Sequence, residues 1–418
     1  MRALLSLSLF LSLTVLAQDI YLGPNDVSIL VPLPKQIKDS ALMLKPTDTG
    51  AYGILFPRET IDLKFDGSKG EPNAALDGQH VDNPNKIYSE LRVVGIRLDP
   101  CGPSAVQSAC KTQVRLAWQT IQQGKAGVRA DDFAAHVFYE ITEEDFKRIV
   151  SGLRSLKAST GIMSSNEALE VHPQLQKFGL DSRYAKKLFG IFLSVIGESR
   201  ISRITYAFGT QEMNNWVFGG YDINNGKIQE IKIPRVTGIE QAGPHGLSQY
   251  FGNCAVEVPA NVAITPHDYF DDKDPTNFVP GPPSVQAIDP PPLQGDIFQF
   301  LFHATKDSDL QSVKDSTLST MRIENPRIHN AETIDCLSCH TAQMARLWVG
   351  REFPDLKMDD QLIQKALFRS KYNLKNTSTH PEKTIVLRAF GYDGMNPAIS
   401  QRVVNETAYV LEQINGKK

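Results

Sequence analysis

Short apolar runs alternate with turn-rich stretches over the first third of the chain, and no helical pattern separates them before residue 140. Arg92–Leu98 and Val114–Trp118 alternate in part between apolar and polar side chains, which is the period of a strand with one buried face. We expect strands at Val27–Pro32, Ile61–Phe65, Leu91–Leu98, Gln113–Trp118 and Ala134–Ile141. Several strands with no helix between them favour an antiparallel, sandwich-like arrangement.

Helical periodicity begins after this region. We expect helices at Glu143–Leu156 and Ser182–Ile196, and then a return to strands. The returning strands are expected at Ile204–Phe208, Trp216–Ile223 and Ile228–Ile233. Residues 18–270 are therefore predicted to form a β-rich α+β part, and the pattern assigns no role to it.

Proline dominates the next segment. Residues 271–295 contain seven prolines, which remove backbone donors and favour extended chain. We interpret this segment as a linker. The chain is accordingly predicted to be multidomain, with a C-terminal region at 296–418 whose core is 326–418.

The first residues have the pattern of a targeting segment. Met1-Arg2 is a short basic start, Ala3–Leu16 is apolar, and Val15-Leu16-Ala17 fits a small-residue cleavage site. The apolar run is shorter than the roughly 20 residues that cross a bilayer. We expect residues 1–17 to be a signal peptide, no transmembrane segment after its cleavage, and export to the periplasm or the cell exterior.

Composition narrows the class of protein. A net charge of −3 argues against a nucleic-acid partner, and 41% apolar residues exclude a disordered chain. The five cysteines are too few for a disulfide framework. Cys101 and Cys110 enclose a short turn-like loop between two expected strands, so we expect a disulfide there in an oxidising compartment. Cys254 is left over and is expected to be a buried thiol.

The decisive motif is Cys336-Leu337-Ser338-Cys339-His340. Two thiols three positions apart can form thioethers with the two vinyl groups of a porphyrin, and the adjacent histidine can ligate the iron. A zinc site would need further ligands, and no second such pair of cysteines exists to supply them. We expect one covalent haem c, held by Cys336 and Cys339, with His340 as the proximal iron ligand.

The last part of the chain resembles a class I monohaem cytochrome c. The motif opens an apparent helix at Thr341–Val349, a glycine-rich turn follows at Phe390–Pro397, and an amphipathic helix at Ala398–Asn415 ends the chain. The resemblance covers about 90 residues and implies a small all-α domain. It also implies that a methionine before the terminal helix is the distal iron ligand.

Met395 has that family-like position and is the candidate distal ligand. His329 and His380 are rivals that would give bis-histidine ligation and a lower potential, and an open sixth position is the third alternative. His136 lies in an apolar strand, which is typical of a core histidine.

We therefore expect an exported electron-transfer protein that serves a redox partner protein, in preference to an enzyme. Two alternatives remain. One is a haem-based sensor or enzyme with an open iron site, and the other is a β-sandwich binding or adhesion protein with an appended haem. No motif of a serine hydrolase, a zinc protease or a nucleotide-binding loop is present. The pattern does not indicate the redox partner, the potential or the oligomeric state.

Overall fold

The computed structural model describes most of the chain. The described residues are 20–60, 84–100, 111–161, 166–210, 215–230, 235–236, 262–266, 285–286, 309–330, 339–340, 342–343, 346, 349–350, 353–376 and 389–416. The signal segment, the expected strand at Ile61–Phe65 and nearly all of the proline-rich segment lie outside them.

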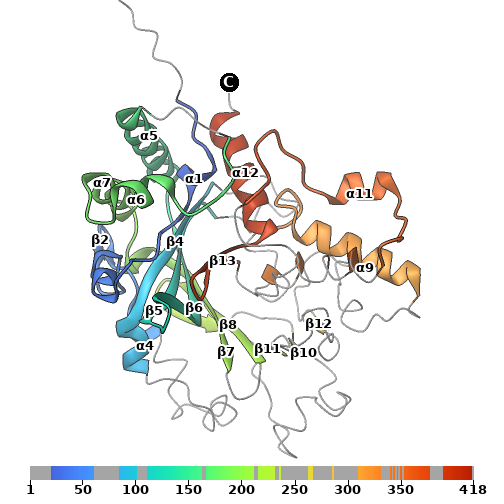
Figure 1. The fold of residues 1–418 in the computed structure, drawn as a ribbon, viewed down its shortest axis with the longest axis horizontal. Helices are drawn as coiled ribbons and strands as arrows, with labels where there is room; N and C mark the ends of the chain where they lie inside the picture. The colour runs from blue at the N-terminus through green and yellow to red at the C-terminus, as the bar shows by residue number, and fades with distance from the viewer. Residues whose placement is uncertain are drawn as a thin grey trace, which may run out of the picture.

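The central element is one eight-stranded antiparallel sheet with the order β1-β4-β5-β6-β7-β8-β11, in which β9 also pairs with β8 (Figure 1). Its strands are β1 (Ser28–Leu30), β4 (Leu91–Asp99), β5 (Gln113–Gln123), β6 (Val128–Glu140), β7 (Ile201–Thr210), β8 (Asn215–Asn224), β9 (Lys227–Glu230) and β11 (Val262–Pro266). Three two-stranded sheets accompany it: β2 (Thr49–Gly50) with β3 (Gly53–Ile54), β10 (Arg235–Val236) with β12 (Val285–Gln286), and β13 (Phe390–Asp393) with β14 (Asn396–Ile399).

Helices lie on both sides of this sheet. They are α1 (Pro24–Val27), α4 (Pro84–Glu90), α5 (Glu143–Thr160), α6 (Pro173–Phe178), α7 (Arg183–Leu193), α9 (Leu310–Ile323), α11 (Asp360–Ala366) and α12 (Gln401–Asn415), with 3₁₀ turns at Ile37–Leu42 and Glu198–Arg200. Figure 1 shows α5, α6 and α7 on one side and α9, α11 and α12 on the other. The sheet is therefore the middle layer of an α+β arrangement.

Local sequence explains where the long helices begin and end. Thr142 caps α5 by accepting a hydrogen bond from the Asp145 backbone, and the Asp145 carboxylate accepts one in return. Gly161 ends the same helix with φ 69°, a left-handed conformation that glycine adopts at little cost. Ser400 caps α12 in the same way as Thr142 caps α5.

The alternating pattern predicted the sheet well. Six of the expected strands coincide with β1, β4, β5, β6, β7 and β8, and the start of a seventh coincides with β9. Both expected helices are present as α5 and α7. The sandwich was not found among the described residues, because helices instead of a second large sheet cover the apolar faces.

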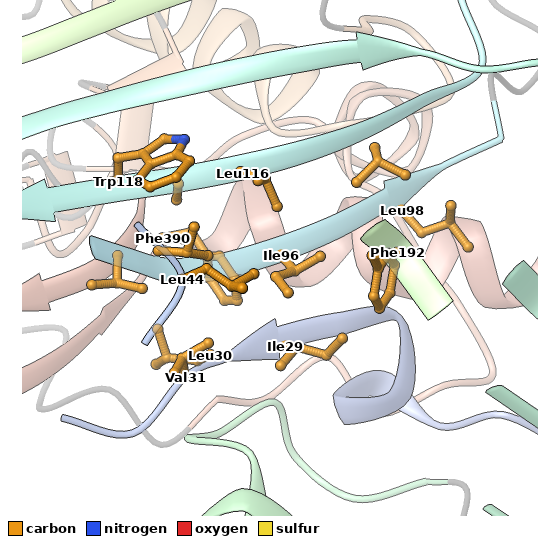
Figure 2. Packing of buried hydrophobic residues seen from close by; sticks show 14 of the residues in the cluster. Ile29, Leu30, Val31, Leu44, Ile96, Leu98, Leu116, Trp118, Phe192 and Phe390 are labelled. Atoms are coloured by element: carbon orange, nitrogen blue, oxygen red, sulfur yellow. The ribbon is translucent and has the colours of Figure 1, made fainter. Parts of the chain in front are cut away.

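The C-terminal region shares the core of the sheet. Phe390, Val403 and Leu411 belong to the same buried cluster as residues of β1, β4, β5 and β6, and Figure 2 shows Phe390 among them. The described part of this region is also not all-α, since the turn expected at 390–397 is a β-hairpin. Gly394 has φ 57° within the hairpin loop.

A cluster of buried charges joins α12 to the sheet. The Glu406 carboxylate accepts hydrogen bonds from Arg97 on β4, from Arg115 on β5 at 3.4 Å and from Arg402 on its own helix at 2.7 Å. The Glu406 side chain is 12% exposed and that of Arg402 is 2% exposed. Burial raises the pKa of Glu406, but the three guanidinium groups outweigh it and hold the pKa well below its usual range.

No helix among the described residues is long and apolar enough to cross a membrane.

Replacing Glu406 with Gln should lower the free energy of unfolding by about 3–5 kcal/mol, because it leaves buried arginines without their counter-charge. Glu143→Gln is the control, since the Glu143–Lys147 pair is exposed and should contribute at most about 1 kcal/mol. Urea denaturation of both variants measures the difference. Equal, small losses would contradict the structural role of the cluster.

The same carboxylate should shape the acid stability. Its folded-state pKa lies below the ordinary value of 4.5, so the stability that the ionised Glu406 contributes is present above that pH and is lost as the pH falls below it. The wild type should therefore lose up to about 1.4 kcal/mol per pH unit more than Glu406→Gln in this range. His172, whose pKa burial lowers to about 4, affects both proteins alike. Urea denaturation at several pH values measures the free energy of unfolding of both proteins. If it falls equally with decreasing pH in both, Glu406 does not shape the acid stability.

Candidate functional site

The motif histidine lies in a helix. Cys339, His340 and the described residues 342–343, 346 and 349–350 are helical, in agreement with the helix predicted from the sequence at Thr341–Val349, and Ala342 and Val349 are buried. Cys339 and His340 are each partly exposed. We refer to these described residues between 339 and 350 as the motif helix.

Two polar contacts fix the position of the motif helix. The backbone N–H of Gln401, the first residue of α12, donates to the Gln343 side chain at 2.5 Å. Arg346 donates to both carboxylate oxygens of Glu324, at 2.8 and 3.2 Å. Glu324 is 3% exposed and directly follows α9. The motif helix is thus held between the start of α12 and the end of α9.

Glu324 is also tied to α12. Its backbone carbonyl accepts a hydrogen bond from Asn405 at 2.9 Å. Arg402 continues this connection, because it donates to the carbonyls of Ile323 at 2.8 Å and His329 at 2.7 Å. The charge cluster around Glu406 therefore positions the motif helix over the sheet.

His340 faces His136 of the sheet. The two imidazole centroids are 6.2 Å apart and the ring planes are inclined by 45°. Both rings line a small cleft of about 20 Å³, which is roughly the room that one water molecule needs. Its other lining residues are Ala117, Trp118, Gln119, Ala134, Thr205, Tyr206, Ala207, Ala389 and Phe390.

The sheet around His136 carries small side chains. The register of β4 to β8 places Gly95, Ala117, His136, Thr205 and Gly220 in one row of directly paired residues. We call this row the His136 row. Residues paired in this way share one face of a sheet. His136 is thus the one large side chain in its row.

The β13–β14 hairpin closes one end of the row. A Cβ atom on Gly95 would lie 2.6 Å from Cδ1 of Phe390, so the phenyl ring occupies the space that any larger residue would need. Gln119 fixes the hairpin further, since it accepts from the Tyr392 backbone at 2.7 Å and donates to the Tyr392 carbonyl at 2.9 Å. Phe390 thereby becomes a wall of the cleft.

Met395 is not brought to His340. It lies in the loop of the β13–β14 hairpin, is 49% exposed, and its methyl group is close to Gly127 at the far end of β6. The adjacent Gly394 accepts a hydrogen bond from the backbone of Ala130 at 2.9 Å. Ala130 and His136 are six residues apart on β6, which is about 20 Å along a strand.

His329 is fully buried and lines a different cavity, together with Arg97, Arg115, Arg402 and Glu406. The remaining sequence candidates, namely Cys336, His380, Cys101, Cys110 and Cys254, lie outside the described residues.

The sequence predicts a core position for His136, because a lone histidine in an apolar strand is typical of one, and did not predict its contact with the His340 ring. The available signal was weak: His136 stands in a run rich in alanine, Ala134-Ala135-His136. Only strand pairing shows that its neighbours on the same face are also small.

Within the described part of the chain, no group of three or more His, Cys, Asp or Glu side chains is arranged to hold a metal ion.

Comparison with protein-family models, with curated proteins and with solved structures finds no match for this chain. The site must therefore be interpreted from its own chemistry.

Replacing Arg346 with Ala should lower the free energy of unfolding by about 1–3 kcal/mol, because the buried Glu324 carboxylate loses both side-chain hydrogen bonds. Arg346→Lys keeps the charge without the two-fold contact and should give an intermediate loss. Lys147→Ala, which removes an exposed pair, is the control. Denaturation midpoints rank the stability losses of the three variants. A loss in Arg346→Ala no larger than that in Lys147→Ala would contradict the anchoring role of Arg346.

Proposed function

We propose that this chain is an exported c-type cytochrome that carries one covalent haem and transfers electrons to or from a redox partner protein. The observation that supports this proposal best is the placement of His340. The motif histidine is partly exposed on a helix, and its ring lines the edge of a small cleft beside the sheet. A partly exposed imidazole adjacent to a thiol can be presented to a bound group.

The donor chemistry of the motif, two thiols and an adjacent imidazole, fits a covalent haem. The cleft between His340 and His136, about 20 Å³, does not fit a porphyrin. The two rings, 6.2 Å apart and inclined by 45°, have the geometry of an ordinary tilted aromatic pair.

The chain supplies attachment, ligation and orientation. The thiols of Cys336 and Cys339 would hold the haem as thioethers, each by addition of S–H across one vinyl double bond, which needs no oxidant. His340 would hold the iron through an imidazole nitrogen. The contacts of Gln343 and Arg346 hold the motif helix, and therefore the imidazole, in a fixed orientation. Haem bound in this way supplies one-electron redox chemistry.

Export supports the proposal independently. The pattern of residues 1–17 directs the chain to an oxidising compartment, where free thiols would otherwise form disulfides. Attachment of both motif thiols as thioethers makes them stable there. A single attachment motif in 418 residues suits a carrier of one electron.

Co-expression of the full chain with a haem-maturation system should yield a mature protein that begins at Gln18 and carries one haem. Intact-mass spectrometry and the pyridine haemochrome spectrum measure the attachment. The double variant Cys336→Ala/Cys339→Ala should lose covalent haem entirely, because no thioether can form. Cys254→Ser is the control and should retain it. A mature wild-type chain without added haem would refute the proposed function.

A further inference from the structure

We infer that a large cleft in the β-rich part of the chain binds a short peptide segment of a partner protein, one that carries basic and apolar side chains. The cleft has a volume of about 980 Å³, at the upper end of the roughly 300–1,000 Å³ that ligand pockets occupy. Ile228 is one of its lining residues, and we call it the Ile228 cleft. The inference goes beyond electron transfer and does not depend on the haem.

The Ile228 cleft lies on the face of the sheet opposite His136. Gly220 of β8 belongs to the His136 row, and Ile223 stands three positions further along the same strand. Because side chains alternate between the two faces of a strand, Ile223 and its partner Ile228 on β9 lie on the other face. The cleft also shares no lining residue with the cavities beside His340 and Glu406. It is therefore a separate site.

Tight turns hold the walls of the Ile228 cleft in place. Asn225 and Gly226 have φ 51° and 72°, the left-handed conformation that favours a two-residue hairpin turn, and they connect β8 to β9. In a second wall, the backbone N–H of Ser199 donates to the Tyr52 carbonyl at 3.1 Å. A Cβ atom on Gly197 would lie 2.3 Å from the carbonyl carbon of Tyr52, so the chain is closely packed there. The cleft is thus preformed, and binding requires little reorganisation.

The apolar part of the Ile228 cleft consists mainly of isoleucines. Ile141, Ile201, Ile223 and Ile228 line it. Ile141 and Ile201 are buried, whereas Ile228 is 44% exposed. Covering an exposed isoleucine with an apolar side chain of a ligand removes water from both surfaces, which is favourable. The ligand is therefore expected to carry at least one apolar side chain.

The charges available to a ligand in this cleft are negative. Glu59 and Glu198 line it and are exposed, and no ion pair joins either of them to another described residue. A third lining carboxylate, that of Glu140, is paired with Lys111 at 3.1 Å.

The positive charge in the lining is already engaged. Arg200 lies 3.6 Å from the Asp145 carboxylate, and its guanidinium carbon is 4.3 Å from the centre of the Tyr52 ring. An anionic ligand would therefore meet repulsion from Glu59 and Glu198 without a free counter-charge. A cationic ligand is complementary to the cleft.

A peptide segment satisfies the apolar and the charged parts of the cleft together. Lysine or arginine side chains can meet the carboxylates while an apolar neighbour covers Ile228. Successive residues of an extended segment are about 3.3 Å apart along the chain, so several side chains fit over a cleft of this size. A small organic cation would fill only part of the volume.

The test uses the full-length mature protein and two end-blocked peptides, acetyl-Leu-Lys-Leu-Lys-amide and the acidic acetyl-Leu-Glu-Leu-Glu-amide. Isothermal titration calorimetry should detect binding of the lysine peptide and none of the acidic peptide. Glu59→Gln/Glu198→Gln should weaken binding of the lysine peptide about fivefold, because two exposed ion pairs are lost. Ile228→Thr should weaken it about threefold through the lost apolar contact. The control Glu167→Gln removes an exposed carboxylate that does not line the cleft, and it should leave the affinity unchanged.

Several results would overturn the inference. One is a wild type that binds neither peptide, and another is equal binding of the lysine and acidic peptides. These two comparisons need no variant, so they decide even if a substitution disturbs folding. A third is an affinity that the Glu59/Glu198 double variant leaves unchanged, and a fourth is butylammonium that binds as tightly as the peptide, which would identify a small organic cation as the occupant. A chain without haem that still binds the lysine peptide would refute the proposed function alone.

Discussion

The packing of α12 on the sheet depends on one buried carboxylate. Glu406 is bound by arginines from β4, from β5 and from its own helix, and two of these arginines are about 300 residues away in the sequence. A buried charge that loses its partner is costly, so α12 has one favourable register against the sheet. A slide by one helical turn would leave the carboxylate and the guanidinium groups uncompensated.

The contacts of the Glu406 cluster also hold the candidate site in position. Arg402 links the Glu406 cluster to the carbonyls of Ile323 and His329, and Asn405 binds that of Glu324. Glu324 in turn holds Arg346 of the motif helix. The imidazole of His340 is thereby positioned over the sheet by a continuous series of hydrogen bonds that begins at the sheet. The β-rich part and the motif helix are thus connected by hydrogen bonds in the described structure.

Local patterns predicted the local features. Alternation identified most strands of the large sheet, because one buried face imposes a period of two on each strand. The helix starts expected at Glu143 and Ser182 agree with the observed N-caps Thr142 of α5 and Ser182 of α7. The five-residue motif predicts haem attachment, because the spacing of its cysteines matches the two vinyl groups of a porphyrin, and this stays a prediction.

The features that were missed depend on contacts between distant residues. The segment at 390–397 was expected to be a glycine-rich turn, yet residues 390–393 pair with 396–399 and dock on Gln119 of β5 as a hairpin. That docking places Met395 beside Gly127. The small side chains beside His136 were likewise not predicted, because only strand pairing shows that Ala117 and Thr205 flank it. No local pattern contains this information.

The central claim is the proposal that the Cys336–His340 motif binds one haem with His340 as an iron ligand. The most direct measurement is pulsed electron paramagnetic resonance of the ferric, full-length protein, grown with ¹⁵N-labelled histidine. The account predicts a labelled imidazole nitrogen coupled to the iron in the wild type, in addition to the unlabelled porphyrin nitrogens. Iron without any coupled labelled nitrogen would contradict it, because His340 would then not be a ligand.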